Sequence, residues 1–241
     1  MAGISVLPAT GAAHPVRVWC ARCGYAFAAI FLVGALGVAH WFPPLAPSDT
    51  AEATAAIYRT ETLGIRTGLL IVFLGQILFP FLGAAIAAQT REIPGAGRVL
   101  SYAQLAAVGC ASMAMVGPLA VFFATAYRPE RAPELTQALN DVGWIAFMVA
   151  FPPFVAWAVA VGAAILSDIS SRPGYPRWSG YASILVGLGQ MPAGLLIFFT
   201  TGPFAWNGLF AFWIPALCFF GWILTITALT TRASAAKPES S

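Results

Sequence analysis

Six long apolar segments, separated by short polar breaks, dominate this chain of 241 residues. Only 9% of the residues are charged, whereas an average soluble domain has about 25%. A helix of about 20 apolar residues is long enough to cross a bilayer. The pattern therefore predicts an all-α membrane protein with six transmembrane helices, near residues 22–42, 64–88, 99–127, 142–167, 180–201 and 206–230.

The two ends of the chain differ from its centre in composition. Residues 1–16 and 232–241 contain Gly, Ala, Ser and Pro but few side chains that a fold would bury, which is typical of loose tails. We therefore expect a disordered N-terminal tail over 1–16, a six-helix bundle over 17–231 and a C-terminal tail over 232–241. Because no clear small-residue cleavage site follows the first apolar segment, we expect this segment to remain as a span.

Basic residues are divided unequally between the two predicted faces of the membrane. Six spans put both termini on one side, and eight of the twelve Arg and Lys residues fall there, whereas six of the nine acids fall on the other side. The positive-inside rule makes the side of the termini cytoplasmic. No basic cluster is dense enough to indicate nucleic-acid binding. The eight basic residues on the side of the termini are Arg17, Arg22, Arg91, Arg98, Arg172, Arg177, Arg232 and Lys237.

The chain carries an internal repeat. Residues 83–103 align without a gap on residues 162–182, with nine identities in 21 positions. Each copy ends one predicted span and begins the next, so we expect three helical hairpins in the same orientation. The shared Pro-Gly and Tyr-Ala pairs favour a simpler interpretation, in which the repeat is only a turn with an aromatic anchor at the membrane interface.

Polar groups are scarce near the predicted midplane. No charged side chain falls there, and ion-coupled carriers usually need one, so a neutral ligand fits more easily. Gln76 and Gln190 do fall there, both in the context Leu-Gly-Gln. They either offer amides to a ligand in a central cavity or bond across helices as packing contacts. Prolines that would kink the helices lie inside five of the six predicted spans, at Pro80, Pro118, Pro152, Pro153, Pro192 and Pro215.

The predicted outer end gathers acids and aromatic side chains. Residues 47–52 have the pattern of a helix start, with Asp49 as the expected cap of a short outer helix. The acids and rings either form a general-acid site over an apolar pocket or belong to an interfacial aromatic belt with solvated charges. The candidate catalytic acids are Asp141 and Glu61, and the candidate ligand contacts are Trp144, Phe204, Trp206 and Asn207, together with the two glutamines.

Cys20 and Cys23 form a C-x-x-C pair next to Trp19. These residues resemble the Trp-Cys-x-x-Cys of thioredoxin-like proteins, but the βαβ context that such a motif requires is missing. Only His14 could join the pair locally, and a structural zinc site needs four ligands. We therefore expect two reduced cysteines, no metal and no cofactor.

Three short strings, at residues 139–144, 176–181 and 202–208, occur together in this chain. As a set they resemble motifs of a family of uncharacterised polytopic membrane proteins from actinobacteria and related high-GC bacteria. The resemblance would extend over residues 24–232. It implies a bacterial plasma membrane, and it implies no activity, so no catalytic residue follows from it.

Two functions are compatible with these patterns. The first is an integral membrane protein that binds or passes a neutral hydrophobic small molecule, alone or as a subunit of a larger system. Its expected contacts are that molecule and membrane lipids, and no pattern identifies a protein partner. The second is a membrane-embedded enzyme acting on a lipid or isoprenoid, in which Asp141 or Glu61 supplies a proton and aromatic faces stabilise a carbocation, as in membrane-embedded terpene cyclases. A structural subunit without a ligand is the remaining alternative.

Overall fold

The computed structural model describes residues 15–171 and 173–235. Within these residues the chain is helical and has no strand. Six segments are long and apolar enough to cross a membrane, which confirms the predicted all-α class with six transmembrane helices. His14, Arg172 and Lys237, which the sequence predictions used, lie outside the described residues. The six spans are Pro15–Val38, Thr62–Thr90, Gly97–Tyr127, Pro133–Ser167, Arg177–Phe198 and Leu209–Ala235.

Several spans extend beyond their predicted ends. The first begins at Pro15 and the last ends at Ala235, so both continue into segments that were expected to be tails. The fourth begins at Pro133 and has 35 residues, which as a straight α-helix measure about 52 Å. A bilayer with its headgroups is only about 40–45 Å thick. As a straight helix the fourth span is therefore longer than a bilayer is thick.

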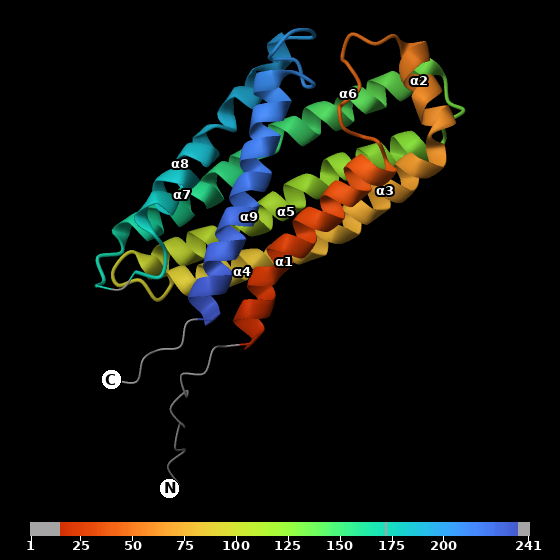
Figure 1. Cartoon of the computed structure of the whole chain (residues 1–241). Helices are drawn as coiled ribbons and strands as arrows, with labels where there is room; N and C mark the ends of the chain where they lie inside the picture. Colours follow the sequence, from red (N-terminus) through yellow and green to blue (C-terminus); the bar gives the residue numbers. More distant parts are fainter. Residues whose placement is uncertain (1–14, 172, 236–241) are drawn as a thin grey trace, which may run out of the picture.

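The spans form one bundle in which each runs opposite to its neighbours in sequence (Figure 1). Their helices pack in the ring order α1, α4, α5, α7, α8 and α9, and α9 closes the ring against α1. The start of α1 and the end of α9 lie at the same end of the bundle, here called the terminal end, and the opposite end is called the distal end (Figure 1). The helices of the ring are α1 (Pro15–Leu32), α4 (Phe79–Thr90), α5 (Gly97–Tyr127), α7 (Phe151–Ser167), α8 (Arg177–Leu188) and α9 (Ile214–Ala235).

Five of the six spans depart from α-helical geometry along their length. Only α5 stays α-helical throughout, with Pro118 inside it. The departures are a π-helical segment η1 (Val33–Val38) after α1, a 3₁₀ turn η2 (Gln76–Leu78) between α3 (Thr62–Gly75) and α4, a break at Ala150 between α6 (Pro133–Val149) and α7, a 3₁₀ segment η3 (Met191–Phe198) after α8, and a π-helical segment η4 (Leu209–Trp213) before α9.

Prolines account for four of these departures, because a proline has no N–H for the carbonyl four residues before it. Pro80 leaves the Gln76 carbonyl without its α-helical donor, and the Phe79 N–H bonds to that carbonyl instead, which makes the 3₁₀ turn. Pro152 and Pro153 directly follow the break at Ala150. Pro192 lies in η3 and Pro215 follows η4. The π-helical η1 contains no proline, and the sequence did not predict it.

A short helix, α2 (Ala51–Thr60), lies at the distal end and packs against α6 (Figure 1). Its presence confirms the predicted helix start, but the predicted cap was wrong by one residue. Thr50 is the cap, and its hydroxyl accepts from the Ala53 N–H at 3.2 Å. The Asp49 carboxylate instead accepts from the Ala46 N–H at 3.0 Å, so it stabilises the turn that leads into the helix.

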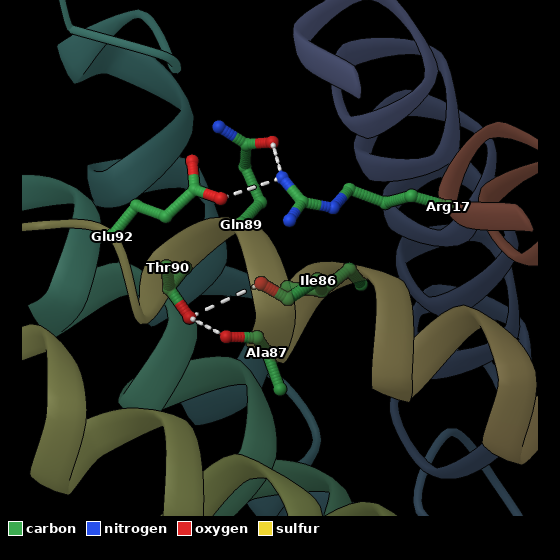
Figure 2. Close-up of polar contacts among 6 residues, drawn as sticks. All are labelled: Arg17, Ile86, Ala87, Gln89, Thr90 and Glu92. Atoms are coloured by element: carbon green, nitrogen blue, oxygen red, sulfur yellow. Dashed lines mark hydrogen bonds and ion pairs between the residues drawn. The ribbon is translucent and has the colours of Figure 1, made fainter. Parts of the chain in front are cut away.

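At the terminal end, Arg17 of α1 reaches the end of α4 (Figure 2). Its Nη1 lies 2.8 Å from the Glu92 carboxylate and 3.5 Å from the Gln89 side-chain oxygen. The side chain of Glu92 is 58% exposed, and an exposed ion pair contributes about 0–1 kcal/mol. The contact therefore orients the two helix ends more than it stabilises them.

The two copies of the repeat form helix-to-helix turns at the terminal end, before α5 and before α8. Their shared glycines allow close packing. A Cβ on Gly83 would lie 2.6 Å from the Val108 side chain, and one on Gly162 would lie 2.6 Å from the Gly180 carbonyl oxygen. The shared tyrosines, Tyr102 and Tyr181, are each 55% exposed on the outside of the bundle. These positions favour the interpretation of the repeat as a packed turn with an interfacial anchor.

Candidate binding cavity

A cavity of about 120 Å³ lies inside the bundle at the level of the helix breaks. Residues of all six spans line it, and at four spans the lining includes a residue at the break itself. These break residues are Gln76, Ala150, Gln190 and Phe212. The backbone at a break bends the helix and leaves space that a straight helix would fill. The prolines of the sequence therefore create the space as well as the kinks.

The lining is almost entirely apolar and has no charged side chain. Ten of its twenty lining residues are phenylalanines, and Met115 and Met148 add flexible side chains. The rings contact one another edge to face or tilted, at centroid distances that aromatic pairs prefer. Phe27 lies 4.8 Å from Phe79, and Phe154 lies 4.9 Å from Phe219. The lining phenylalanines are Phe27, Phe31, Phe42, Phe79, Phe147, Phe151, Phe154, Phe212, Phe219 and Phe220.

Gln76 is one of two polar side chains in this wall. It is only 7% exposed, and among the described residues neither its Oε1 nor its Nε2 has a hydrogen-bond partner. A buried donor or acceptor without a partner costs about 1–3 kcal/mol. The two amide atoms are buried even from the cavity, so a ligand held there reaches them once the Gln76 side chain turns toward it.

Gln190 lines the same cavity but has a different environment. Its Nε2 donates to the Pro215 carbonyl at 3.2 Å and lies 3.4 Å from the Val186 carbonyl. The first contact joins the fifth span to the sixth beside their breaks. For Gln190 the packing interpretation is therefore supported, because its donor group is already used within the bundle.

The predicted acids lie outside this lining. Glu61 is exposed in the junction between α2 and α3. Asp141 is half-buried two turns into α6, beside Asn140. Asn140 is the residue that makes the buried contact there, since the Tyr58 hydroxyl donates to its Oδ1 at 3.1 Å. Burial, with a smaller effect from the negative charge of Asp141, raises the pKa of Tyr58, so the phenol stays a neutral donor.

The four predicted contacts at the distal end also lie outside the lining. Trp144 is fully buried and packs on Trp41, with ring centroids 4.8 Å apart. Trp206 donates from its indole N–H to the Leu45 carbonyl at 2.7 Å. Phe204 stacks on Phe210 at 5.0 Å, and Asn207 is half-buried in the same turn. These side chains close the distal end of the bundle, and their predicted role in ligand binding stays a prediction.

Sequence reasoning did not identify the phenylalanine wall. Phe27 and Phe31 are four residues apart on α1, a spacing that places two rings on one helix face. That signal was available, but many of the 18 phenylalanines in the chain lie elsewhere. Which of them share a cavity depends on the packing order of the spans.

Chemically, the cavity can bind a neutral molecule and hold one polar group of it at Gln76. The four cysteines are free, and within residues 15–171 and 173–235 no group of three or more His, Cys, Asp or Glu side chains could hold a metal ion. Comparison with protein-family models, with curated proteins and with solved structures found no match to this chain. The geometry of the cavity therefore carries the functional argument.

Proposed function

We propose that this membrane protein binds, or lets pass, a neutral hydrophobic small molecule in the central cavity, with the Gln76 amide as its polar contact. One observation carries the proposal: Gln76 is buried in a wall of aromatic and aliphatic side chains, and both of its amide atoms lack a partner among the described residues. A bound polar group would remove that cost of burial.

The absence of charge from the lining supports a neutral ligand. An ionised group in an apolar environment without a partner loses several kcal/mol of hydration, and among the described residues the cavity wall offers no counterion. The same lining supports binding over acid-initiated chemistry. Asp141 and Glu61 are not among the lining residues, so neither is positioned to protonate a molecule held against Gln76.

We also propose that the protein resides in a bacterial plasma membrane with both termini in the cytoplasm. The support is the excess of basic residues at the terminal end and the resemblance of the motifs at 139–144, 176–181 and 202–208. In a background with the four native cysteines replaced, a membrane-impermeant thiol reagent applied to intact cells should label A132C at the distal end. It should not label A96C at the terminal end. Labelling of A96C alone would reverse the proposed orientation.

The binding proposal is tested with two matched glutamine variants. Gln76→Leu removes the unpartnered amide. Gln104→Leu removes an equally buried amide that does not line the cavity, lies 3.2 Å from the Thr90 hydroxyl and donates to the Ala160 carbonyl at 3.4 Å. The wild type and both variants are purified in mild detergent. The bound small molecules are then quantified by mass spectrometry, and the melting temperatures are measured.

We expect Gln76→Leu to lose the bound molecule, while Gln104→Leu retains it. Gln104→Leu should have the lower stability, because a bonded amide in a membrane interior contributes about 0.6–2 kcal/mol, whereas an unbonded one destabilises the fold. Equal amounts of the molecule in the wild type and Gln76→Leu would exclude Gln76 as the polar contact. If nothing copurifies with any of the three proteins, the cavity is a packing feature of a structural subunit.

A further inference from the structure

We infer that the ligand of the cavity is a planar, single-ring aromatic molecule that carries an uncharged carboxamide, or a group like it with a donor and an acceptor side by side. This inference rests on the proposed function and names its substrate class. Three properties of the cavity lead to it: the pair of free atoms on Gln76, the lack of charge and the shape of the phenylalanine wall.

The Gln76 side chain presents a donor and an acceptor on the same carbon. Nε2 can donate and Oε1 can accept, and both are unsatisfied among the described residues. A ligand with only an acceptor, such as a simple ketone, would satisfy Nε2 and leave Oε1 buried without a donor. A primary carboxamide satisfies both atoms at once, in a cyclic pair of hydrogen bonds.

Water is a poor alternative occupant. A buried water is held by about two to four polar partners, and the lining contains only two polar side chains. The Nε2 of the second, Gln190, already donates to the Pro215 carbonyl. Among the other side chains of the lining, only the Gln190 Oε1 is left to bond such a water.

The remaining wall favours a flat aromatic ring. Phe27, Phe79 and Phe219 all contribute to the lining and lie within 4.8–6.3 Å of one another by ring centroid. Faces and edges of such rings pack well against another aromatic ring. The cavity of about 120 Å³ is smaller than a protein cavity of about 150 Å³ that binds benzene, so it has room for one ring at most. Met115 and Met148 can adjust to the extra atoms of a carboxamide.

The lack of charge in the lining predicts that the cavity rejects the anionic analogue of such an amide. Benzoate has nearly the shape of benzamide but carries a full negative charge at neutral pH. Gln76 can donate to it, but no described cation in the lining compensates the charge. Toluene has the ring without the polar group. The three compounds therefore separate the contributions of the ring, the hydrogen bonds and the charge.

The test is equilibrium dialysis of isotope-labelled benzamide, benzoate and toluene against the protein in lipid nanodiscs, with empty nanodiscs subtracted. Gln76→Leu is the variant, and Gln104→Leu is the control outside the cavity. Wild type should bind benzamide at least about tenfold more tightly than benzoate. Gln76→Leu should weaken benzamide binding by about tenfold or more, because an unpaired amide on the ligand is costly, and should leave toluene binding unchanged or stronger.

Benzamide binding that is equal in wild type and Gln76→Leu would overturn the inference. Toluene binding to the wild type with no benzamide binding would also overturn it and would exclude Gln76 as the polar contact. The first part of the proposed function, binding of a neutral hydrophobic molecule in the cavity, would stand. If neither compound binds and no molecule copurifies with the wild type, the proposed function fails as well. Loss of benzamide binding in Gln104→Leu would show that the effect is a general loss of folding, and would overturn the assignment to Gln76.

Discussion

The Tyr58 hydroxyl joins α2 to α6 at the distal end through its hydrogen bond to Asn140. Both side chains are buried, with 3% and 2% exposure. At neutral pH, Tyr58→Phe leaves the Asn140 oxygen without this donor, and we expect a loss of about 1–3 kcal/mol in the free energy of unfolding. The exposed Tyr127, at 70%, is the matched control, and Tyr127→Phe should change the free energy little.

The raised pKa of Tyr58 also leads us to expect a loss of stability at high pH. Burial raises the pKa of Tyr58 above its ordinary value of 10.0, so above that pH the folded state holds a proton that the unfolded state has released. The free energy of unfolding then falls as pH rises, whereas below pH 10 both states hold the proton and this residue contributes no pH dependence. Tyr175 adds to the effect, since burial raises its pKa too, against the opposing effect of its bond to Thr230.

The measurement is detergent-induced unfolding of the wild type, Tyr58→Phe and Tyr127→Phe across this range. The decline above pH 10 should be shallower in Tyr58→Phe than in the other two proteins. Parallel curves for all three would show that Tyr58 does not retain its proton in the folded state.

Single residues also show how far sequence reasoning extends. The common context of Gln76 and Gln190 was enough to predict that both amides reach the centre of the bundle. It could not predict that only Gln190 is bonded, because its acceptor is the carbonyl of Pro215, 25 residues away on another span. The general-acid interpretation of Asp141 and Glu61 depended on a shared pocket, and sequence alone does not fix the distance between a pocket and a side chain.

At the scale of elements, the least predictable feature is the π-helical η1 and its packing on α3. Gly34 of η1 and Gly68 of α3 meet backbone to backbone. A Cβ on Gly68 would overlap the Gly34 carbonyl oxygen and Ala39, and one on Gly34 would lie 2.8 Å from the Gly68 carbonyl oxygen. Small residues allow this approach in membranes. Hydropathy predicts the span but not its local geometry, because π and α segments have the same composition.

Gly68→Ala is therefore expected to destabilise the protein by about 1–3 kcal/mol, since extra atoms in a packed interface force the backbones apart. Gly117→Ala is the control, because a Cβ on that helical glycine of α5 would meet nothing within 4 Å. We expect it to be neutral or stabilising by up to about 1 kcal/mol. Thermal unfolding in one detergent compares the two. Equal losses would show that η1 and α3 are not in close contact.

At the scale of the whole molecule, the spans were predictable because each is a long apolar run, and the hairpin order followed from their alternation. The closure of the ring by α9 against α1 was not predictable, since it depends on contacts between residues about 200 positions apart. The cavity has the same origin. Five spans depart from α-helical geometry, and the space appears only when the ring brings the breaks of four spans to one level.

The central claim is that this cavity holds a ligand against Gln76. An experimental structure of the protein purified in mild detergent, at a resolution that defines side-chain amides, tests it most directly. We expect density for a non-protein molecule in the phenylalanine wall, with two of its atoms about 2.7–3.2 Å from Oε1 and Nε2 of Gln76. A collapsed cavity, with the Gln76 amide bonded to backbone groups of the neighbouring spans, would contradict it.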